Sequence, residues 1–182
     1  MRPLLWYYRY MENKQFKIAV TFGRFNLLHK GHIMLFQQMA DYADEIVIGV
    51  SNNSKNLSFA NRMQVIDLAL APLGINYTVV EAANPFEVFD LVNAKEPNLV
   101  TAFFGEDQTA LSIAAHRAYG WVPKTIERLS SSTVVRTLID NEEWDLLGKI
   151  IPSRIMSNVI RLRGYERTNR PSSVLPYNSA TN

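Results

Sequence analysis

From Phe16 onward the sequence alternates between two kinds of segment, and this alternation constrains the fold more than any other feature. Five short apolar runs are rich in β-branched and aromatic residues: Phe16–Phe22, Glu45–Ser51, Asn76–Glu81, Asn98–Phe104 and Trp121–Arg128. Longer stretches with helical spacing separate them, so a strand–helix–strand rhythm repeats about every 25–30 residues. This rhythm predicts βαβ units with right-handed crossovers. We therefore expect an α/β protein with an open, doubly wound parallel sheet of about five strands and helices on both faces.

The stretches between the runs carry the apolar spacing of amphipathic helices. The positions are Ile33, Phe36, Gln37 and Ala40; Met63, Ile66, Leu70 and Leu73; Phe86, Phe89 and Val92; and Ala110, Ile113, Ala114 and Arg117. After Arg128 the pattern is helical only, which predicts a helical C-terminal part. We expect an N-terminal arm over residues 1–15, one domain over 16–163 and an extended tail over 164–182.

Composition excludes several classes of protein. The 182 residues are 47% hydrophobic with a net charge of +2, which is typical of an ordered globular domain rather than a disordered or polybasic chain, so nucleic acid is not an expected partner. The absence of cysteine excludes disulfides, thiolate zinc sites and a cysteine nucleophile. No apolar run approaches the ~20 residues of a membrane span, and no signal sequence is recognisable. The expected location is therefore the cytoplasm, without membrane contact.

The segment Thr21–Phe36 carries the strongest functional signal. An apolar run ends at Phe22, turns at Gly23 and enters a helical pattern near His32. In open α/β sheets, ligands bind beyond the carboxyl ends of strands, where a helix N-terminus offers free N–H groups. The turn carries four basic side chains and two further residues beside them, in the order Arg24, Phe25, Asn26, His29, Lys30 and His32. We expect the two imidazoles, three positions apart, to converge on one small anion.

A second anion-binding segment is predicted at Leu129–Ile139. Ser131, Ser132 and Thr133 form an N-cap cluster whose hydroxyls and backbone N–H groups suit a phosphate, and Arg136 follows one helical turn later. Helix caps alone would explain the hydroxyls, but two such segments in one small domain suit a polyphosphate held from two sides. The sequence lacks the G-x-x-x-x-G-K-[ST] loop, the G-x-G-x-x-G turn, HExxH and G-x-S-x-G, which disfavours P-loop hydrolases, standard dinucleotide dehydrogenases, zinc peptidases and serine hydrolases.

These two segments, GRFNLLHKGH and SSSTVVR, resemble the two signatures of the HIGH-type nucleotidyltransferase superfamily. The resemblance spans Phe16 to Val159 and includes EIVIGVSNNS, SFANRMQVIDLAL and FFGEDQ. It implies a Rossmann-like fold and the joining of a nucleoside triphosphate to a phosphorylated small-molecule acceptor. Gly23-Arg24-Phe25 with His-x-Gly-His, and the later NEEWDLLGKIIP, look most like compact, archaeal-like nicotinamide-mononucleotide adenylyltransferases.

The same sequence departs from that subgroup at Asn26-Leu27, where Gln-Pro or Met-Pro is usual. Leu27-Leu28-His29 is closer to cytidylyltransferases that act on glycerol phosphate or choline phosphate. Two alternatives therefore stay open: cytidylyl transfer to a phospho-alcohol, and a non-catalytic nucleotide-binding or structural subunit. The aromatic and basic start of the chain, Arg2–Tyr10, would suit a docking or base-stacking role in the second case.

The resemblance implies roles for individual residues. His29, His32, Lys30 and Arg136 would neutralise charge at the reacting phosphates. The nucleotide would be bound by Phe22, Gly23, Arg24, Phe25, Gly105, Asp107, Ser131, Ser132 and Thr133. Within this set, Asp107 would take a ribose hydroxyl and Gly105 would allow close approach. Mg²⁺ would be held mainly by the substrate phosphates. The resemblance also implies a homo-oligomer.

Overall fold

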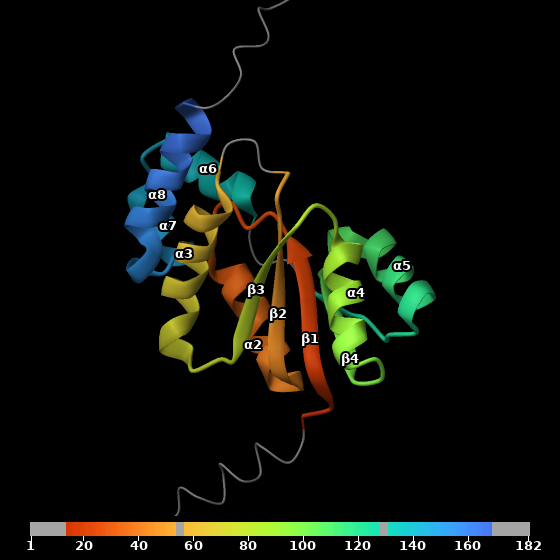
Figure 1. Ribbon diagram of the computed structural model, residues 1–182. Coiled ribbons are helices and arrows are strands. Elements are labelled where there is room, and N and C mark those ends of the chain that lie inside the picture. Colours follow the sequence, from red (N-terminus) through yellow and green to blue (C-terminus); the bar gives the residue numbers. More distant parts are fainter. Residues whose placement is uncertain (1–13, 54–56, 128–130, 169–182) are drawn as a thin grey trace, which may run out of the picture.

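The computed structural model describes residues 14–53, 57–127 and 131–168. Its centre is a five-stranded, all-parallel sheet in the order β3-β2-β1-β4-β5 (Figure 1). The strands are β1 (Phe16–Gly23), β2 (Ala43–Ser51), β3 (Tyr77–Ala82), β4 (Val100–Gly105) and β5 (Lys124–Ile126). The helices are α2 (Lys30–Tyr42), α3 (Phe59–Leu70), α4 (Pro85–Lys95), α5 (Thr109–Tyr119), α6 (Ser132–Asp140), α7 (Trp144–Ile150) and α8 (Ser153–Thr168). The doubly wound α/β fold predicted from the sequence is confirmed.

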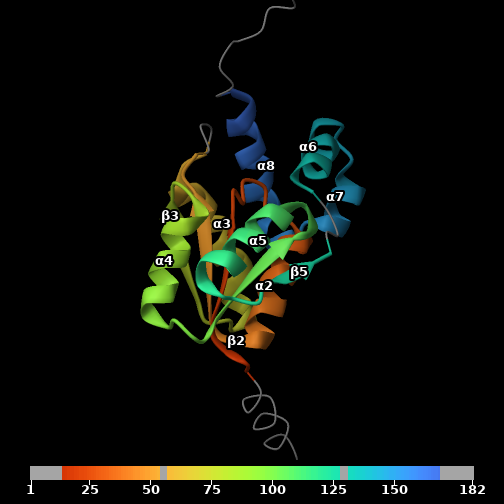
Figure 2. The ribbon, with the colours of Figure 1, turned by 90° about the vertical axis from the view of Figure 1, so that its right-hand side faces the viewer.

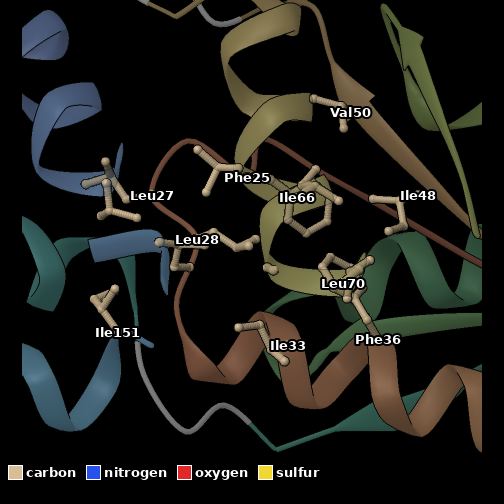
Figure 3. Close-up of a cluster of buried hydrophobic side chains, with 14 of the residues drawn as sticks. Phe25, Leu27, Leu28, Ile33, Phe36, Ile48, Val50, Ile66, Leu70 and Ile151 are labelled. Carbon is tan, nitrogen blue, oxygen red and sulfur yellow. The ribbon is translucent and has the colours of Figure 1, made fainter. Parts of the chain in front are cut away.

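The helices cover the two faces of the sheet unequally (Figures 1 and 2). The larger buried cluster joins one face to α2, α3 and the three C-terminal helices, and it includes Phe36, Ile66, Leu147 and Val159 (Figure 3). The smaller cluster joins the other face to α4 and α5. This division follows from the strand order, since right-handed crossovers place the helices before and after the reversal on opposite faces.

Side chains at the helix starts fix where several helices begin. The Ser58 hydroxyl accepts a hydrogen bond from the Asn61 amide at the start of α3. Asn84 Oδ1 accepts from two amides at the start of α4, where Pro85 occupies the first helical position. Such caps satisfy amide groups that would otherwise lack an intrahelical partner.

The helix faces differ in places from those expected from the apolar spacing. Met63, Phe86 and Ile113 are exposed, whereas Arg62 and Ala115 are buried. A guanidinium that satisfies its hydrogen bonds on backbone carbonyls can occupy an interior position, so Arg62 is buried and Met63 is not, whereas Ile66 and Leu70 are buried as expected. From α5, Ala115 is buried against the sheet, and Leu111 and Tyr119 pack beside it.

The C-terminal helix is longer than expected. α8 continues to Thr168, five residues past the predicted domain boundary at 163, and it buries Glu166. Most of the predicted arm and all residues of the tail after Thr168 lie outside the described part of the chain. Within the described part, every helix is too short or too polar to cross a membrane.

Candidate functional site

A cavity of about 520 Å³ lies at the carboxyl ends of β1 and β4. These strands are neighbours in the sheet, yet the chain leaves β1 toward one face and β4 toward the other, so a crevice opens between them. The lining residues come from four separate parts of the chain. They are Thr21, Phe22, Gly23, Arg24, Phe25, Asn26, His29, Gly31, His32, Leu35, Gly105, Asp107, Gln108, Ile126, Glu127, Ser132, Thr133 and Arg136.

The turn after β1 forms the first wall of this cavity. Phe25 has a left-handed backbone, with φ of 48°, which is uncommon for a residue with a bulky side chain. Its ring is buried, 5.5 Å from the Phe36 ring centroid and edge-on to His32 at 5.2 Å. A Cβ on Gly23 would lie 3.0 Å from the same ring, so the glycine lets the chain turn closely over it. The tight turn thus sets the position of the histidines that follow.

His29 and His32 are stacked, with ring centroids 3.9 Å apart and an interplanar angle of 29°. His29 is almost fully buried at the N-cap position of α2, and His32 lies one turn later. Both residues line the cavity, so the packing that buries His29 leaves it in contact with the space where a ligand would sit. The pair can present ring N–H groups to one anion.

Two helix N-termini meet at the same cavity. The amides of Lys30 and Gly31 precede the first intrahelical hydrogen bond of α2, which runs from the His32 amide to the His29 carbonyl. At α6 the Ser131 hydroxyl accepts from the Val134 amide, which leaves the earlier Ser132 and Thr133 amides at the helix start. Amides at a helix N-terminus favour negative charge.

The opposite wall follows β4. Gln108 bridges the two strand ends, because its side-chain amide donates to the Phe22 carbonyl at 3.3 Å and its oxygen accepts from the Gly105 amide at 3.2 Å. A Cβ on Gly105 would lie 2.7 Å from Asp107 Oδ1. The absence of a side chain at Gly105 therefore allows the Asp107 carboxylate to fold back over the strand end.

The buried side chain of Arg62 supports the turn after β1 from the protein interior. Its Nη1 donates to the Arg24 carbonyl at 3.0 Å and to the Ser51 carbonyl at 2.6 Å, and its Nε donates to the Ser58 carbonyl at 3.3 Å. Burial lowers the pKa of Arg62, and the charge of Glu81 opposes that shift. This guanidinium joins the turn after β1, the end of β2 and the start of α3.

A network of charges joins α6 to α8 at the edge of the cavity. Arg136 donates from Nε and Nη2 to the two carboxylate oxygens of Glu166, each at 2.8 Å. Arg163 donates to Glu166 at 3.2 Å and makes two hydrogen bonds to Asp140. Burial raises the pKa of Glu166, but the hydrogen bonds and charges of Arg136 and Arg163, with a hydrogen bond from Asn26, hold it below its usual value.

The sequence pattern of the cytidylyltransferase-like family matches residues 20–144, which is more than half of the chain. The matched stretch includes every part of the chain that lines the cavity. The chain belongs to the cytidylyltransferase-like family. Membership agrees with the nucleotidyltransferase resemblance found in the sequence.

Relatives of this cytidylyltransferase-like protein include the nicotinamide-nucleotide adenylyltransferase of Pyrococcus furiosus, which is 25% identical over 167 residues, covering 83% of this chain and 87% of the relative. A putative nicotinate-nucleotide adenylyltransferase from Vibrio parahaemolyticus has a similar structure, with a TM-score of 0.64, 16% identity and coverage of 82% and 94%. A bifunctional NMN adenylyltransferase/ADP ribose pyrophosphatase from Francisella tularensis, complexed with AMP and a manganese ion, has a TM-score of 0.62, 19% identity and coverage of 84% and 51%. At these identities the structural matches support the fold.

The cavity of this cytidylyltransferase-like protein brings together most residues singled out from the sequence, with two exceptions. Lys30 donates to the Lys149 carbonyl at 2.5 Å, near the carboxyl end of α7, and does not line the cavity. Carbonyls at a helix C-terminus attract a cation, which explains the direction of this side chain. Ser131 caps α6 one residue outside the cavity wall.

Several residues at the cavity had no individual role in the sequence prediction. Thr21, Leu35, Gln108, Ile126 and Glu127 also line the cavity. Glu166 falls in the stretch predicted as an extended tail, and Arg62 falls in a helical pattern, where a charged residue is ordinarily expected to face solvent. A polar residue at an otherwise apolar helix position was the available signal for Arg62, since Val65, Ile66 and Ala69 share its buried face.

Proposed function

We propose that this protein transfers the adenylyl group of ATP to nicotinamide mononucleotide, with formation of NAD and release of pyrophosphate. The observation that carries the proposal is the meeting of two helix N-termini and the stacked histidine pair at one cavity between β1 and β4. This arrangement suits a polyphosphate chain held from two sides. The choice of acceptor rests on relatives named nicotinamide-nucleotide adenylyltransferase.

In this reaction a phosphate oxygen of the acceptor attacks the α-phosphorus of ATP. A phosphorus–oxygen bond forms to the acceptor, and the bond to the β-phosphate breaks, so pyrophosphate leaves with the electron pair. A phosphate monoester is already a nucleophile near neutral pH, so the site need not supply a base. It must align the two phosphates and stabilise the charge that develops during transfer.

The residues of the two walls divide this work. His29 and His32 donate hydrogen bonds to the reacting phosphate and the leaving group, and Arg24 adds charge from the turn. Ser132 and Thr133 hold the outer phosphates through hydroxyls and the start of α6, with Arg136 beside them. On the opposite wall Asp107 accepts a hydrogen bond from a ribose hydroxyl. These roles fit the cavity lining, which contains each of the residues named.

The side chains at the cavity that could coordinate a metal ion fit an ion held mainly by the substrate phosphates. The described residues contain no group of three or more His, Cys, Asp or Glu side chains that could hold a metal ion. Asp107 and Glu127 are the carboxylates in the cavity lining. Mg²⁺ usually keeps several waters and binds substrate phosphates, and when bound it would neutralise phosphate charge. Manganese accompanies AMP in the Francisella tularensis structure.

The cytidylyltransferase alternative gains little from the structure. Leu27 and Leu28, whose match to Leu-Leu-His raised it, are fully buried in the larger cluster beside Ile151 (Figure 3). They therefore shape the core rather than a base-binding surface. A non-catalytic role leaves the histidine pair at the cavity without a purpose, since a scaffold has no physical need for it.

Product identity tests the proposal. The full chain is incubated with Mg²⁺ and either ATP or CTP, with nicotinamide mononucleotide, nicotinate mononucleotide or glycerol phosphate as acceptor, and products are identified by mass. We expect NAD and pyrophosphate from ATP and nicotinamide mononucleotide. A cytidylylated alcohol from CTP would contradict the proposal. Binding of ATP without release of pyrophosphate would also contradict it. Such binding would raise the free energy of unfolding by about 2.7 kcal/mol at 100 times the dissociation constant, and it would be seen as a higher unfolding temperature.

A further inference from the structure

The ion pair between Arg136 and Glu166 has the geometry of a clamp. The side chains lie 30 positions apart in sequence, on α6 and α8, and meet through two hydrogen bonds of 2.8 Å. The Glu166 side chain is 6% exposed, whereas that of Arg136 is 30% exposed and lines the cavity. A bidentate pair fixes the plane of the guanidinium, and a buried partner fixes it more firmly than an exposed one. The clamp therefore determines how Arg136 faces the cavity.

The remaining donors of Arg136 are those that a ligand can use. Nε and one N–H of Nη2 are committed to Glu166, so Nη1 and the second N–H of Nη2 remain on the other edge of the guanidinium. Arg136 lines the cavity, so an anion bound there would meet the guanidinium through this other edge. A guanidinium held in this way needs no reorganisation when charge develops on a phosphate.

The surroundings keep Glu166 itself in place. Arg163 donates to the same carboxylate at 3.2 Å and is held in turn by Asp140, so two guanidinium groups face two carboxylates. Asn26, from the turn after β1, donates to Glu166 at 3.3 Å. One carboxylate thus contacts two of the parts of the chain that line the cavity, the turn after β1 through Asn26 and α6 through Arg136.

We propose that Glu166 is a positioning residue, which orients Arg136 for the outer phosphates of the nucleotide and ties the turn after β1 to α6. The inference rests on the proposed function, since it assigns Arg136 to the triphosphate. The competing idea is a latch, in which Glu166 neutralises Arg136 and must release it before the nucleotide binds. The two ideas predict different effects of removing the charge of Glu166.

Glu166→Gln keeps the shape of the side chain but replaces one acceptor with an amide donor that faces the donors of Arg136. If Glu166 positions Arg136, kcat falls about 10- to 100-fold, as when an orienting partner of a site residue is lost. The KM for ATP changes less than kcat, because the variant also removes one negative charge beside the cavity. A latch instead predicts a lower KM for ATP with no loss of kcat, because the carboxylate would have to release Arg136 before the nucleotide binds. An unchanged or raised kcat overturns the proposal.

A double-mutant cycle separates positioning from a purely structural role. Glu166→Gln is made in the wild type and in Arg136→Ala, and we expect its effect on kcat to shrink to less than twofold in the second background. An equal loss in both backgrounds would show that Glu166 acts on folding or on another residue. Glu45→Gln is the matched control, since it removes a carboxylate that is paired with a cation, Lys95, but lies outside the cavity lining and this network. We expect its kcat to stay within threefold of wild type.

Two further measurements keep the test decisive. If Glu166→Gln fails to fold, Glu166→Asp retains the charge but shortens the side chain by one methylene, and we expect a smaller loss of kcat with the same disappearance in Arg136→Ala. Failure of the proposed function is recognised separately, as absence of pyrophosphate release by wild type. In that event the cycle is read from the dissociation constant of ATP by calorimetry. An effect of Glu166→Gln on ATP affinity that is equal with and without Arg136 overturns the inference.

Discussion

Replacing His32 by alanine tests the histidine pair at the centre of the site. The ring lies 3.9 Å from that of His29 and edge-on to Phe25, and the residue lines the cavity. If the imidazole stabilises charge that develops on the phosphates, its loss removes about 2.7–4 kcal/mol from the transition state, or about 10²–10³ in kcat. Interactions made only in the transition state lower kcat and kcat/KM together, so the KM for ATP should change little.

The structural cost of this substitution is small enough to leave the protein folded. His32 is half-buried in the first turn of α2, so losing the ring costs about 1–2 kcal/mol of packing. The higher helix propensity of alanine recovers about 0.5 kcal/mol. At this chain length the unfolding temperature should fall by less than about 8 °C.

The assay is steady-state release of pyrophosphate at saturating nicotinamide mononucleotide, with calorimetric unfolding of the same samples. His116→Ala is the matched control, because His116 lies on α5 and its Nδ1 is 2.7 Å from the Trp121 carbonyl, outside the cavity lining. We expect kcat of the control to stay within threefold of wild type. A His32→Ala enzyme that folds and retains kcat within threefold of wild type would refute the assignment.

Four other changes have expected outcomes that follow from particular contacts. Arg62→Met removes hydrogen bonds to three backbone carbonyls and should lower the free energy of unfolding by about 2–4 kcal/mol in urea titrations. A loss below about 0.5 kcal/mol, the level of an ordinary surface change, would show that Arg62 does not hold the turn after β1 in place. Gly105→Ala places a Cβ 2.7 Å from Asp107 Oδ1 and should raise the KM for ATP about tenfold with little change in kcat, whereas an unaltered KM would remove Asp107 from the ribose site. Lys30→Met should lower kcat less than threefold in the pyrophosphate assay, since the ammonium donates to a carbonyl of α7. A hundredfold loss would show instead that Lys30 contacts the phosphates during the reaction. The folded-state pKa of Glu166 lies below its ordinary value of 4.5, so the stabilising effect of the ion pair is present above that value and is lost as pH falls through the folded-state pKa. The stability difference between wild type and Glu166→Gln should therefore shrink as pH falls below 4.5 in unfolding titrations, and a constant difference would contradict the ion pair.

The sequence predicted the fold well because its signals are local. β-branched runs such as Ile46–Val50 read as strands covered on both faces, and the glycine turn after Phe22 placed a helix start at the end of β1. The rule that ligands bind beyond the carboxyl ends of strands then located the cavity. The register of α5 was mispredicted because Ile113 was assigned to the core, a position that Ala115 occupies.

The contacts that orient the site could not be read from the sequence. Arg136 and Glu166 lie on separate helices, and their pairing depends on how α8 packs beside α6, which no spacing rule gives. Lys30 sits within the most informative motif, yet the packing of α7 draws its side chain to the Lys149 carbonyl. Local chemistry thus predicted which residues gather at the cavity, while tertiary packing determined which of them face it.

The structure of the full chain with ATP bound tests the central claim most directly, namely that the two walls of the cavity hold one triphosphate. We expect phosphate oxygens within hydrogen-bond distance of His29 or His32 on one side and of Ser132 or Thr133 on the other. The guanidinium of Arg136 should contact the outer phosphates while still paired to Glu166. Phosphates that touch one wall alone, or that lie away from the carboxyl ends of β1 and β4, would contradict the account.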